Sequence, residues 1–123
     1  MCAPSSPVSV LQIHGTADEV IPYAGGNSFG QPFPGAIATA RAWATYYGRT
    51  DAAAPLDVDT AAPTLDLEAT IDGDDDARVS AIGGCPDGIG VELWTIDDAF
   101  HIPSLSSDFV PGLLDFLFAH PKP

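Results

Sequence analysis

The stretch Val8-Ser-Val-Leu-Gln-Ile-His-Gly-Thr-Ala-Asp18 decides how this chain is expected to fold. Residues 8–13 are mostly β-branched and apolar, with a proline before them and His14-Gly15 after them, a pattern that predicts a buried strand. Asp18 then falls in the loop just beyond the carboxyl end of that strand. Catalytic groups and ligands of open α/β sheets gather at this edge. Asp18 is therefore the first candidate site residue.

A second apolar run, Val91-Glu-Leu-Trp-Thr-Ile96, also predicts a strand, and His101 follows it closely. In a Ser-Asp-His triad the carboxylate holds the imidazole in one tautomer while the other ring nitrogen takes a proton from serine. In α/β-hydrolases the chain order is serine, acid, histidine. Asp18 and His101 occur in the order of the acid and the histidine.

The residues from His14 to Gly26, His-Gly-Thr-Ala-Asp-Glu-Val-Ile-Pro-Tyr-Ala-Gly-Gly, closely resemble the acid loop of the polyhydroxybutyrate depolymerase and feruloyl esterase family of α/β-hydrolases. The run 91–96 with His101 resembles the end of the same family, where the last strand leads into Gly-Gly-Gly-His-x-Trp-Pro. Segments 34–48 and 113–121 are similar to its intervening and terminal helices. The resemblance covers nearly all of this chain but only the C-terminal portion of a family member.

The resemblance implies an α/β fold, a partial C-terminal α/β-hydrolase sheet with flanking helices, formed by residues 1–123 as one domain. Residues 51–63 are rich in alanine, aspartate and proline and predict a surface excursion. The implied activity is hydrolysis of carboxylic esters of the polyhydroxyalkanoate or feruloyl type. His101 would act as base and then acid, and Asp18 would orient it. The resemblance thus implies that Asp18 and His101 lie at the same edge of the sheet, with a hydrogen bond of about 2.6–3.2 Å between them.

The nucleophile of such an enzyme is not evident in the sequence. Gly26-Asn-Ser-Phe-Gly30 satisfies the pattern Gly-x-Ser-x-Gly, but the motif needs a strand that turns sharply into a helix, whereas residues 25–35 predict a flexible loop. Ser28 would also give the order acid, serine, histidine. We therefore expect the nucleophile and the oxyanion hole to come from upstream sequence or from another chain. The alternative is a non-catalytic hydrolase remnant or assembly module that acts through a partner chain.

Ordinary roles also exist for the candidate residues. An aspartate such as Asp18 often caps backbone amides in a turn, and His101 could be a histidine with no catalytic role after a strand. Asp98-Ala99-Phe100 replace the family's glycines, which changes the expected surroundings of His101. His14 is expected to be structural, and His120 to sit favourably at a helix C-terminus.

Further elements follow from periodicity. A helix is predicted from Pro34 to Tyr47, with Gly48 as its C-cap. Alternation over Thr64–Ile71 predicts a half-solvated strand, and Arg78–Ile82 predicts another. A last helix is expected to begin at an Asp108 N-cap. Its core stripe is predicted to be Val110, Leu113, Leu114 and Leu117, and its other apolar residues suggest burial on more than one side.

The charge balance excludes some partners. The formal net charge is −13, with 4 lysines and arginines against 17 acidic residues, which speaks against binding to nucleic acid or to an anionic membrane. No run is long enough to span a membrane, and the start has no features of a signal peptide, so we expect a soluble chain. Its location stays open, although the resembled family is typically secreted. No cofactor is expected.

Two smaller patterns carry little functional weight. Asp72, Asp74 and Asp76 have the spacing of a calcium loop, but Ala77 and Gly83 occupy the positions of its glycine and its glutamate, so a solvated hairpin turn is expected instead of a metal site. Cys2 and Cys85 are too few to define a redox compartment, and the resemblance gives Cys85 no disulfide partner.

The resemblance also implies missing neighbours for the sheet. Further strands of the family would lie beside residues 8–13, so their absence leaves a strand edge and bare apolar faces. We therefore expect a homo-oligomer or a companion chain, with residues 8–13 at or near the contact.

Overall fold

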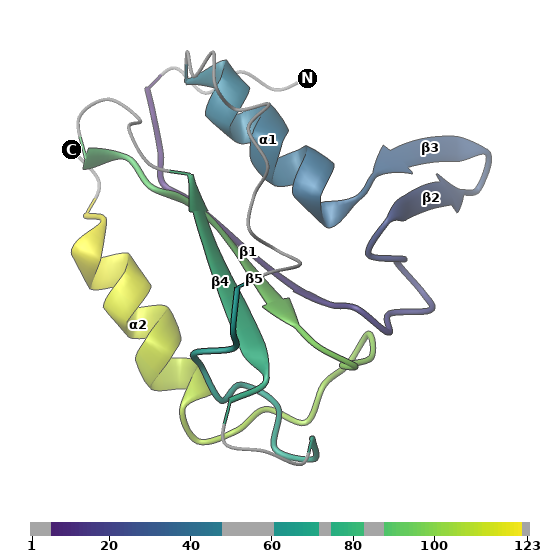
Figure 1. Ribbon diagram of the computed structural model, residues 1–123. Helices are drawn as coiled ribbons and strands as arrows, with labels where there is room; N and C mark the ends of the chain where they lie inside the picture. Colours follow the sequence, from purple (N-terminus) through teal and green to yellow (C-terminus); the bar gives the residue numbers. More distant parts are fainter. Residues whose placement is uncertain (1–5, 48–60, 72–74, 83–87, 122–123) are drawn as a thin grey trace.

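The fold is a small mixed sheet between two helices. The computed structural model describes residues 6–47, 61–71, 75–82 and 88–121. Its three-stranded sheet has the order β1 (Val10–Gly15), β5 (Val91–Ile96), β4 (Ala77–Ile82), with β1 parallel to β5 and β4 antiparallel to it (Figure 1). The predicted α/β class is confirmed. The strands expected at 8–13, 78–82 and 91–96 are present, with shifts of up to two residues at their ends.

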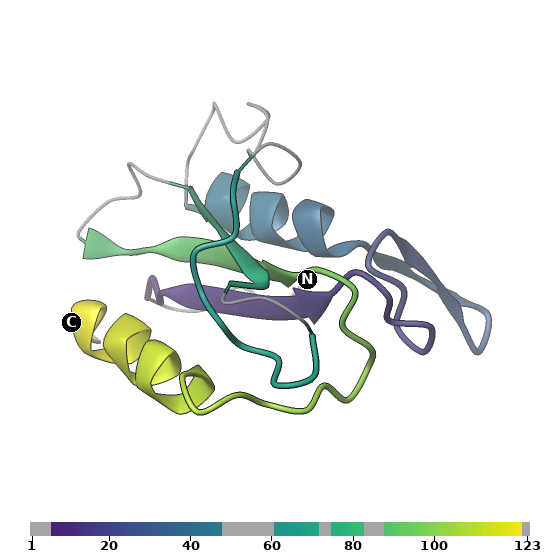
Figure 2. The same cartoon turned by 60° about the horizontal axis from the view of Figure 1, so that its bottom comes forward.

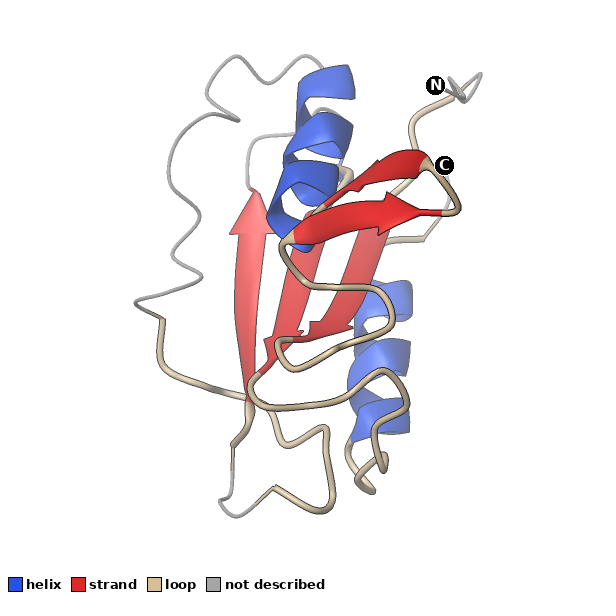
Figure 3. Cartoon of the chain, turned by 90° about the vertical axis from the view of Figure 1, so that its right-hand side faces the viewer, coloured by secondary structure: helices blue, strands red, loops and turns tan. Residues whose placement is uncertain are grey.

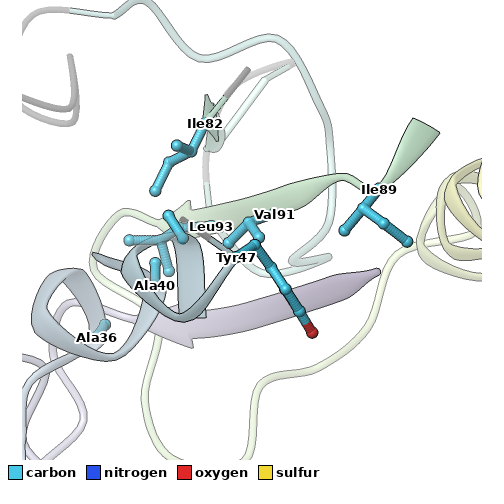
Figure 4. Packing of buried hydrophobic residues seen from close by; sticks show 8 residues of the cluster. Ala36, Ala40, Tyr47, Ile82, Ile89, Val91 and Leu93 are labelled. Atoms are coloured by element: carbon cyan, nitrogen blue, oxygen red, sulfur yellow. The ribbon is translucent and has the colours of Figure 1, made fainter. Parts of the chain in front are cut away.

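The two helices cover opposite faces of this sheet, so the chain has three layers (Figure 2). Helix α1 (Ala36–Tyr46) buries Ala36, Ala40 and Ala44, which share one side because they are four residues apart. These small side chains pack with Val91 and Leu93 of β5 in the first apolar cluster (Figure 4). Tyr47 belongs to the same cluster, and Ile37 packs against it.

Helix α2 (Phe109–Ala119) covers the other face, but with a different side from the one predicted. Its buried residue is Phe116, which packs in the second apolar cluster with Trp94 and Ile96. Gly112 is one turn away from Phe116, and a Cβ atom placed on it would lie 3.6 Å from the Trp94 ring. The side of α2 that carries Gly112 therefore packs on the large Trp94 side chain.

The predicted stripe of α2 is therefore wrong in part. Leu113 is partly buried, but Val110, Leu114 and Leu117 are exposed, as is Phe118. The expectation that other elements bury this helix on more than one side is also wrong within the described residues. Helix α2 begins after Asp108 as predicted, although the Asp108 side chain makes no capping hydrogen bond.

A hairpin forms where residues 25–35 predicted a loop. Strands β2 (Gly25–Ser28) and β3 (Gln31–Pro34) pair antiparallel (Figure 3) and extend away from the sheet (Figure 1). Phe29 and Gly30 at the turn have φ values of 50° and 78°. Two successive positive φ angles are what a type I′ hairpin turn requires. The turn therefore joins the two strands directly.

The hairpin also shifts the start of α1. Pro34 is the last residue of β3, and α1 begins only at Ala36 after the N-cap Gly35, so the predicted start at Pro34 is wrong. Tyr47 is the C-cap, and the predicted cap Gly48 lies outside the described residues.

Residues Thr64–Ile71 do not form the predicted strand and make only isolated bridges, at Leu65 and at Glu68. The Asp76 carboxylate accepts the backbone N–H groups of Leu67 at 3.0 Å and Glu68 at 2.8 Å. These amides are then no longer available to a neighbouring strand. Glu68 was expected on the solvated face, but it is buried.

Several expectations fall on residues outside the described ranges. They concern the excursion over residues 51–60, Asp72 and Asp74 of the expected turn, and both cysteines, Cys2 and Cys85. Among the described residues, neither helix has the length and apolar character needed to cross a membrane.

Candidate functional site

The loops that follow β1 and β5 are joined to each other by hydrogen bonds. Thr16 donates its N–H to Ile96 O at 3.0 Å, and Ala17 donates to Ala99 O at 3.1 Å. In return the N–H of Asp98 donates to Thr16 Oγ1 at 2.9 Å. Because β1 and β5 are parallel, both loops leave the same edge of the sheet. The edge predicted for the site is therefore also where the two loops meet.

Gly15 makes this close contact possible. A Cβ atom at Gly15 would lie 2.2 Å from Ala99 O, a distance that no side chain tolerates. Gly15 was predicted only to follow a strand, and a glycine at this place in His14-Gly15-Thr16 is the sequence signal for such a close approach. In the other loop, the backbone turns at Asp98, which has a positive φ of 57°. Aspartate is among the few side chains that visit this region, which otherwise favours glycine.

Asp18 is fixed by both of its carboxylate oxygens. Oδ1 accepts the N–H groups of Val20 at 2.9 Å and Ile21 at 2.8 Å, which closes a tight turn of the loop. Oδ2 lies 2.9 Å from Nδ1 of His101. The hydrogen bond expected between Asp18 and His101 is therefore present. Asp18 also caps backbone amides, which was the non-catalytic role considered for it.

The acidity of Asp18 follows from these contacts. Its side chain is only 7% exposed, and desolvation by itself would raise the pKa. The hydrogen bonds from His101, Ile21 and Val20 and the attraction of His101 outweigh that effect and lower the pKa to about 2. Asp18 is therefore ionised at any pH near neutrality.

The Asp18 contact sets the tautomer of His101. A carboxylate can only accept a hydrogen bond, so Nδ1 of His101 carries the proton that points to Oδ2. In the neutral ring Nε2 then has a free lone pair and is the atom that can take up a proton. The His101 side chain is 43% exposed, so this nitrogen belongs to a ring that a reactant can approach.

His14 also contacts the Asp18 carboxylate, which agrees with the structural role predicted for it. Its Nε2–H donates to Ile21 O at 2.8 Å and lies 3.4 Å from Asp18 Oδ2. The ring also meets Tyr23 edge to face at 5.4 Å between centroids, and the Tyr23 hydroxyl bonds Thr95 Oγ1 at 2.7 Å. His120 bonds Phe116 O at 2.9 Å at the end of α2, so its contact is with the helix terminus, as expected.

A hollow of about 270 Å³ opens beside the Asp18–His101 pair. Its walls are mainly apolar, with the two polar candidates between them. The lining residues are Ile13, His14, Gly15, Asp18, Ile21, Ile96, Phe100, His101 and Pro103. None of these side chains carries a hydroxyl or a thiol, so the hollow holds a proton acceptor and an acid but no nucleophile of its own. Ser28 is not among them, because it lies beside the hairpin turn, paired with Gln31.

The described residues contain no group of three histidine, cysteine, aspartate or glutamate side chains arranged to hold a metal ion. The carboxylate of Asp76, the described aspartate of the calcium-like pattern, accepts hydrogen bonds from two backbone N–H groups. Comparisons with family models, curated proteins and solved structures gave no match to this chain. The Asp18–His101 pair and its surroundings are therefore the features that bear on function.

Proposed function

We propose that this chain carries the acid and the base of a carboxylic-ester hydrolase of the polyhydroxyalkanoate depolymerase or feruloyl esterase type. The observation that supports it is the hydrogen bond from His101 Nδ1–H to Asp18 Oδ2, in a half-open apolar hollow at the carboxyl edge of a parallel strand pair. His101 lines this hollow and its side chain is 43% exposed, so a reactant can approach the second imidazole nitrogen. Acid–base chemistry requires that nitrogen to be open.

In the proposed reaction His101 Nε2 takes the proton of a serine hydroxyl while the serine oxygen attacks the ester carbonyl. The tetrahedral intermediate expels the alcohol, to which His101 returns the proton, and an acyl-serine remains. Water then attacks the acyl group with His101 again as base. Throughout, ionised Asp18 holds the ring in the required tautomer and stabilises the imidazolium.

The serine and the oxyanion donors belong, in this proposal, to a polypeptide segment other than the described residues. The apolar lining of the hollow suits the acyl or aryl part of an ester, and it gives no hydroxyl to attack it. Loss of one oxyanion donor commonly costs about 2.7–4 kcal/mol of transition-state stabilisation. The isolated chain should therefore hydrolyse activated esters only feebly.

A second candidate, an assembly module without activity, has support from the exposed surface. Val10 and Thr16 donate to carbonyls beside and within β5, so the backbone groups of Leu11 and Ile13 point to the other side of β1. No described strand pairs with that side. Both candidates therefore agree on a further polypeptide beside β1.

Labelling with a serine-directed fluorophosphonate tests the proposal. The protein is isolated from its natural source with its associated polypeptides, labelled, and digested to locate the modified serine by mass spectrometry. The proposal expects one labelled serine in the assembly that contains this chain, a burst of nitrophenol from nitrophenyl butyrate, and loss of both in the variant His101→Ala. An assembly that contains this chain and shows neither labelling nor a burst would favour the non-catalytic module.

A further inference from the structure

The segment that carries His101 has little apolar packing to hold it. Residues 97–108 run from β5 to α2 without a helix or a regular strand. The two neighbours of the histidine, Phe100 and Ile102, are both exposed. Before the histidine, Ala99 is buried in the second apolar cluster and accepts the N–H of Ala17. After the histidine, hydrogen bonds further along the segment supply the order that keeps the ring directed at Asp18.

Four such bonds join the segment to residues 66–69, which precede it by more than thirty positions. They are Ser104 N–H to Glu68 Oε1 at 2.9 Å, Ala69 N–H to Ser104 O at 2.6 Å, Ser106 N–H to Leu67 O at 3.0 Å, and Ser106 Oγ–H to Asp66 O at 2.7 Å. The first involves a charged acceptor, which makes it the strongest type among the four. Of these four bonds, the two at Ser104 are nearest to His101 in the chain, and this bond is one of them.

Glu68 has the burial and the partners of a fixed anchor. The residue is 5% exposed, and its carboxylate accepts Ser104 N–H at Oε1 and Thr70 Oγ1–H at Oε2, the latter at 2.7 Å. Thr70 N–H adds a longer contact of 3.3 Å to Oε1. A buried carboxylate is costly unless such donors surround it.

Asp76 fixes the backbone of this anchor in turn. Its carboxylate holds the amide of Glu68 at 2.8 Å and that of Leu67 at 3.0 Å, and its own carbonyl accepts the N–H of Asp97 at 3.0 Å. Asp97 opens the segment that contains His101. The backbone carbonyl of Asp76 thus ties the beginning of this segment, and the carboxylate of Glu68 ties its middle.

We infer that Glu68 is a positioning residue for His101, which acts through the backbone of Ser104 to keep the imidazole aligned with Asp18. The inference rests on the proposed function only in giving His101 a reaction to perform. The alignment itself is a property of the folded chain. Glu68 does not line the hollow, so its effect must pass through the segment 101–104.

Nuclear magnetic resonance of the ¹⁵N-labelled imidazole of His101 tests this inference. Glu68→Asp keeps the charge but is too short to reach Ser104, so exchange of the His101 Nδ1 proton with water should become about tenfold faster. Glu68→Gln keeps an acceptor oxygen for Ser104 N–H and should retain the exchange rate of the unmodified chain. Thr70→Ala removes a donor to Glu68 but not the contact with Ser104, and should also leave the rate unchanged.

A folding control separates positioning from general loosening. Ile89→Val weakens the first apolar cluster, whose described members include no residue of the segment 97–108, and it should lower the stability while the His101 exchange rate stays constant. The inference is overturned by an unchanged exchange rate in Glu68→Asp, or by an equal acceleration in Ile89→Val. Absence of any fluorophosphonate-reactive serine would count against the proposed hydrolase alone, because the exchange measurement does not depend on turnover.

Discussion

His101 Nδ1 lies 2.9 Å from Asp18 Oδ2 although the two residues are 83 positions apart in the chain. The contact exists because each residue follows one strand of the parallel pair β1 and β5, and because Gly15 lets the two loops touch. These contacts lower the pKa of the Asp18 carboxyl group and fix the tautomer of the His101 imidazole.

The Asp18 carboxyl group should titrate at about pH 2, well below its ordinary value of 3.8. Since the pKa is lower in the folded chain than in the unfolded chain, ionised Asp18 contributes stability that is fully present above about pH 4 and is lost as the pH falls towards 2. Carbon-detected magnetic resonance gives the midpoint, and urea unfolding gives the stability. In Asp18→Asn this part of the acid dependence should vanish. A midpoint near 3.8 would contradict the bonding described for Oδ2.

Asp18→Asn should reverse the tautomer of His101. The asparagine oxygen can still accept the amides of Val20 and Ile21, so the amide NH₂ faces Nδ1 and favours the ring with its proton on Nε2. The base is then lost, and kcat of the hydrolase proposed above should fall by about 10⁴-fold. Ring ¹⁵N shifts report the tautomer independently of activity. Asp108→Asn makes the same chemical change at a residue without a capping bond and should alter neither quantity.

Gly15→Ala should destabilise the chain by about 1–3 kcal/mol, because the new methyl group meets the carbonyl of Ala99 and pushes the two loops apart. The Asp18–His101 hydrogen bond should weaken with it. Gly112→Ala is the matched control, since its Cβ has ordinary contact with Trp94 and a helical glycine is replaced, so stability should rise by up to about 1 kcal/mol. Denaturant unfolding measures both. Equal effects of the two substitutions would argue against a special role of Gly15.

The isolated chain should associate or bind an apolar dye through α2, where Leu117 is 52% and Phe118 77% exposed. Leu117→Glu with Phe118→Glu should abolish dye binding and shift light scattering to the mass of a monomer. Phe29→Glu adds a similar charge at the hairpin turn, away from α2, and should have no such effect. A monomer that binds no dye before any substitution would remove the surface support for a partner.

The sequence was most informative where a local pattern had no competitor. Residues 91–96 form a strand because an apolar run of that length, flanked by glycine and aspartate, has few other ways to be buried. The alanines of α1 likewise define one packing side. The meeting of Asp18 and His101 was predicted from the family resemblance, and the rule on the carboxyl ends of strands placed Asp18 at the same edge.

The errors arose where a distant group competed with the local pattern. The alternation over 64–71 predicted a strand, but Asp76 captures the amides that a strand would need. In α2 the apolar residues surround the helix almost completely, so periodicity could not select a side, and Trp94 did so through Gly112. The anchor Glu68 was missed for the same reason. Its partner Ser104 lies 36 positions away, and nothing near Glu68 in the sequence marks it.

The parallel pairing of β1 with β5 also bears on the order in which the chain can fold. Val10 pairs with Val91, so the ribosome adds 81 residues after Val10 before it reaches this partner. At about 5–20 residues per second, that takes several seconds. During that interval Leu11 and Ile13 lack the second apolar cluster, against which they pack in the folded chain. Synthesis of this protein should therefore depend on whatever shields a nascent strand, and loss of a chaperone should lower its yield before it changes its stability.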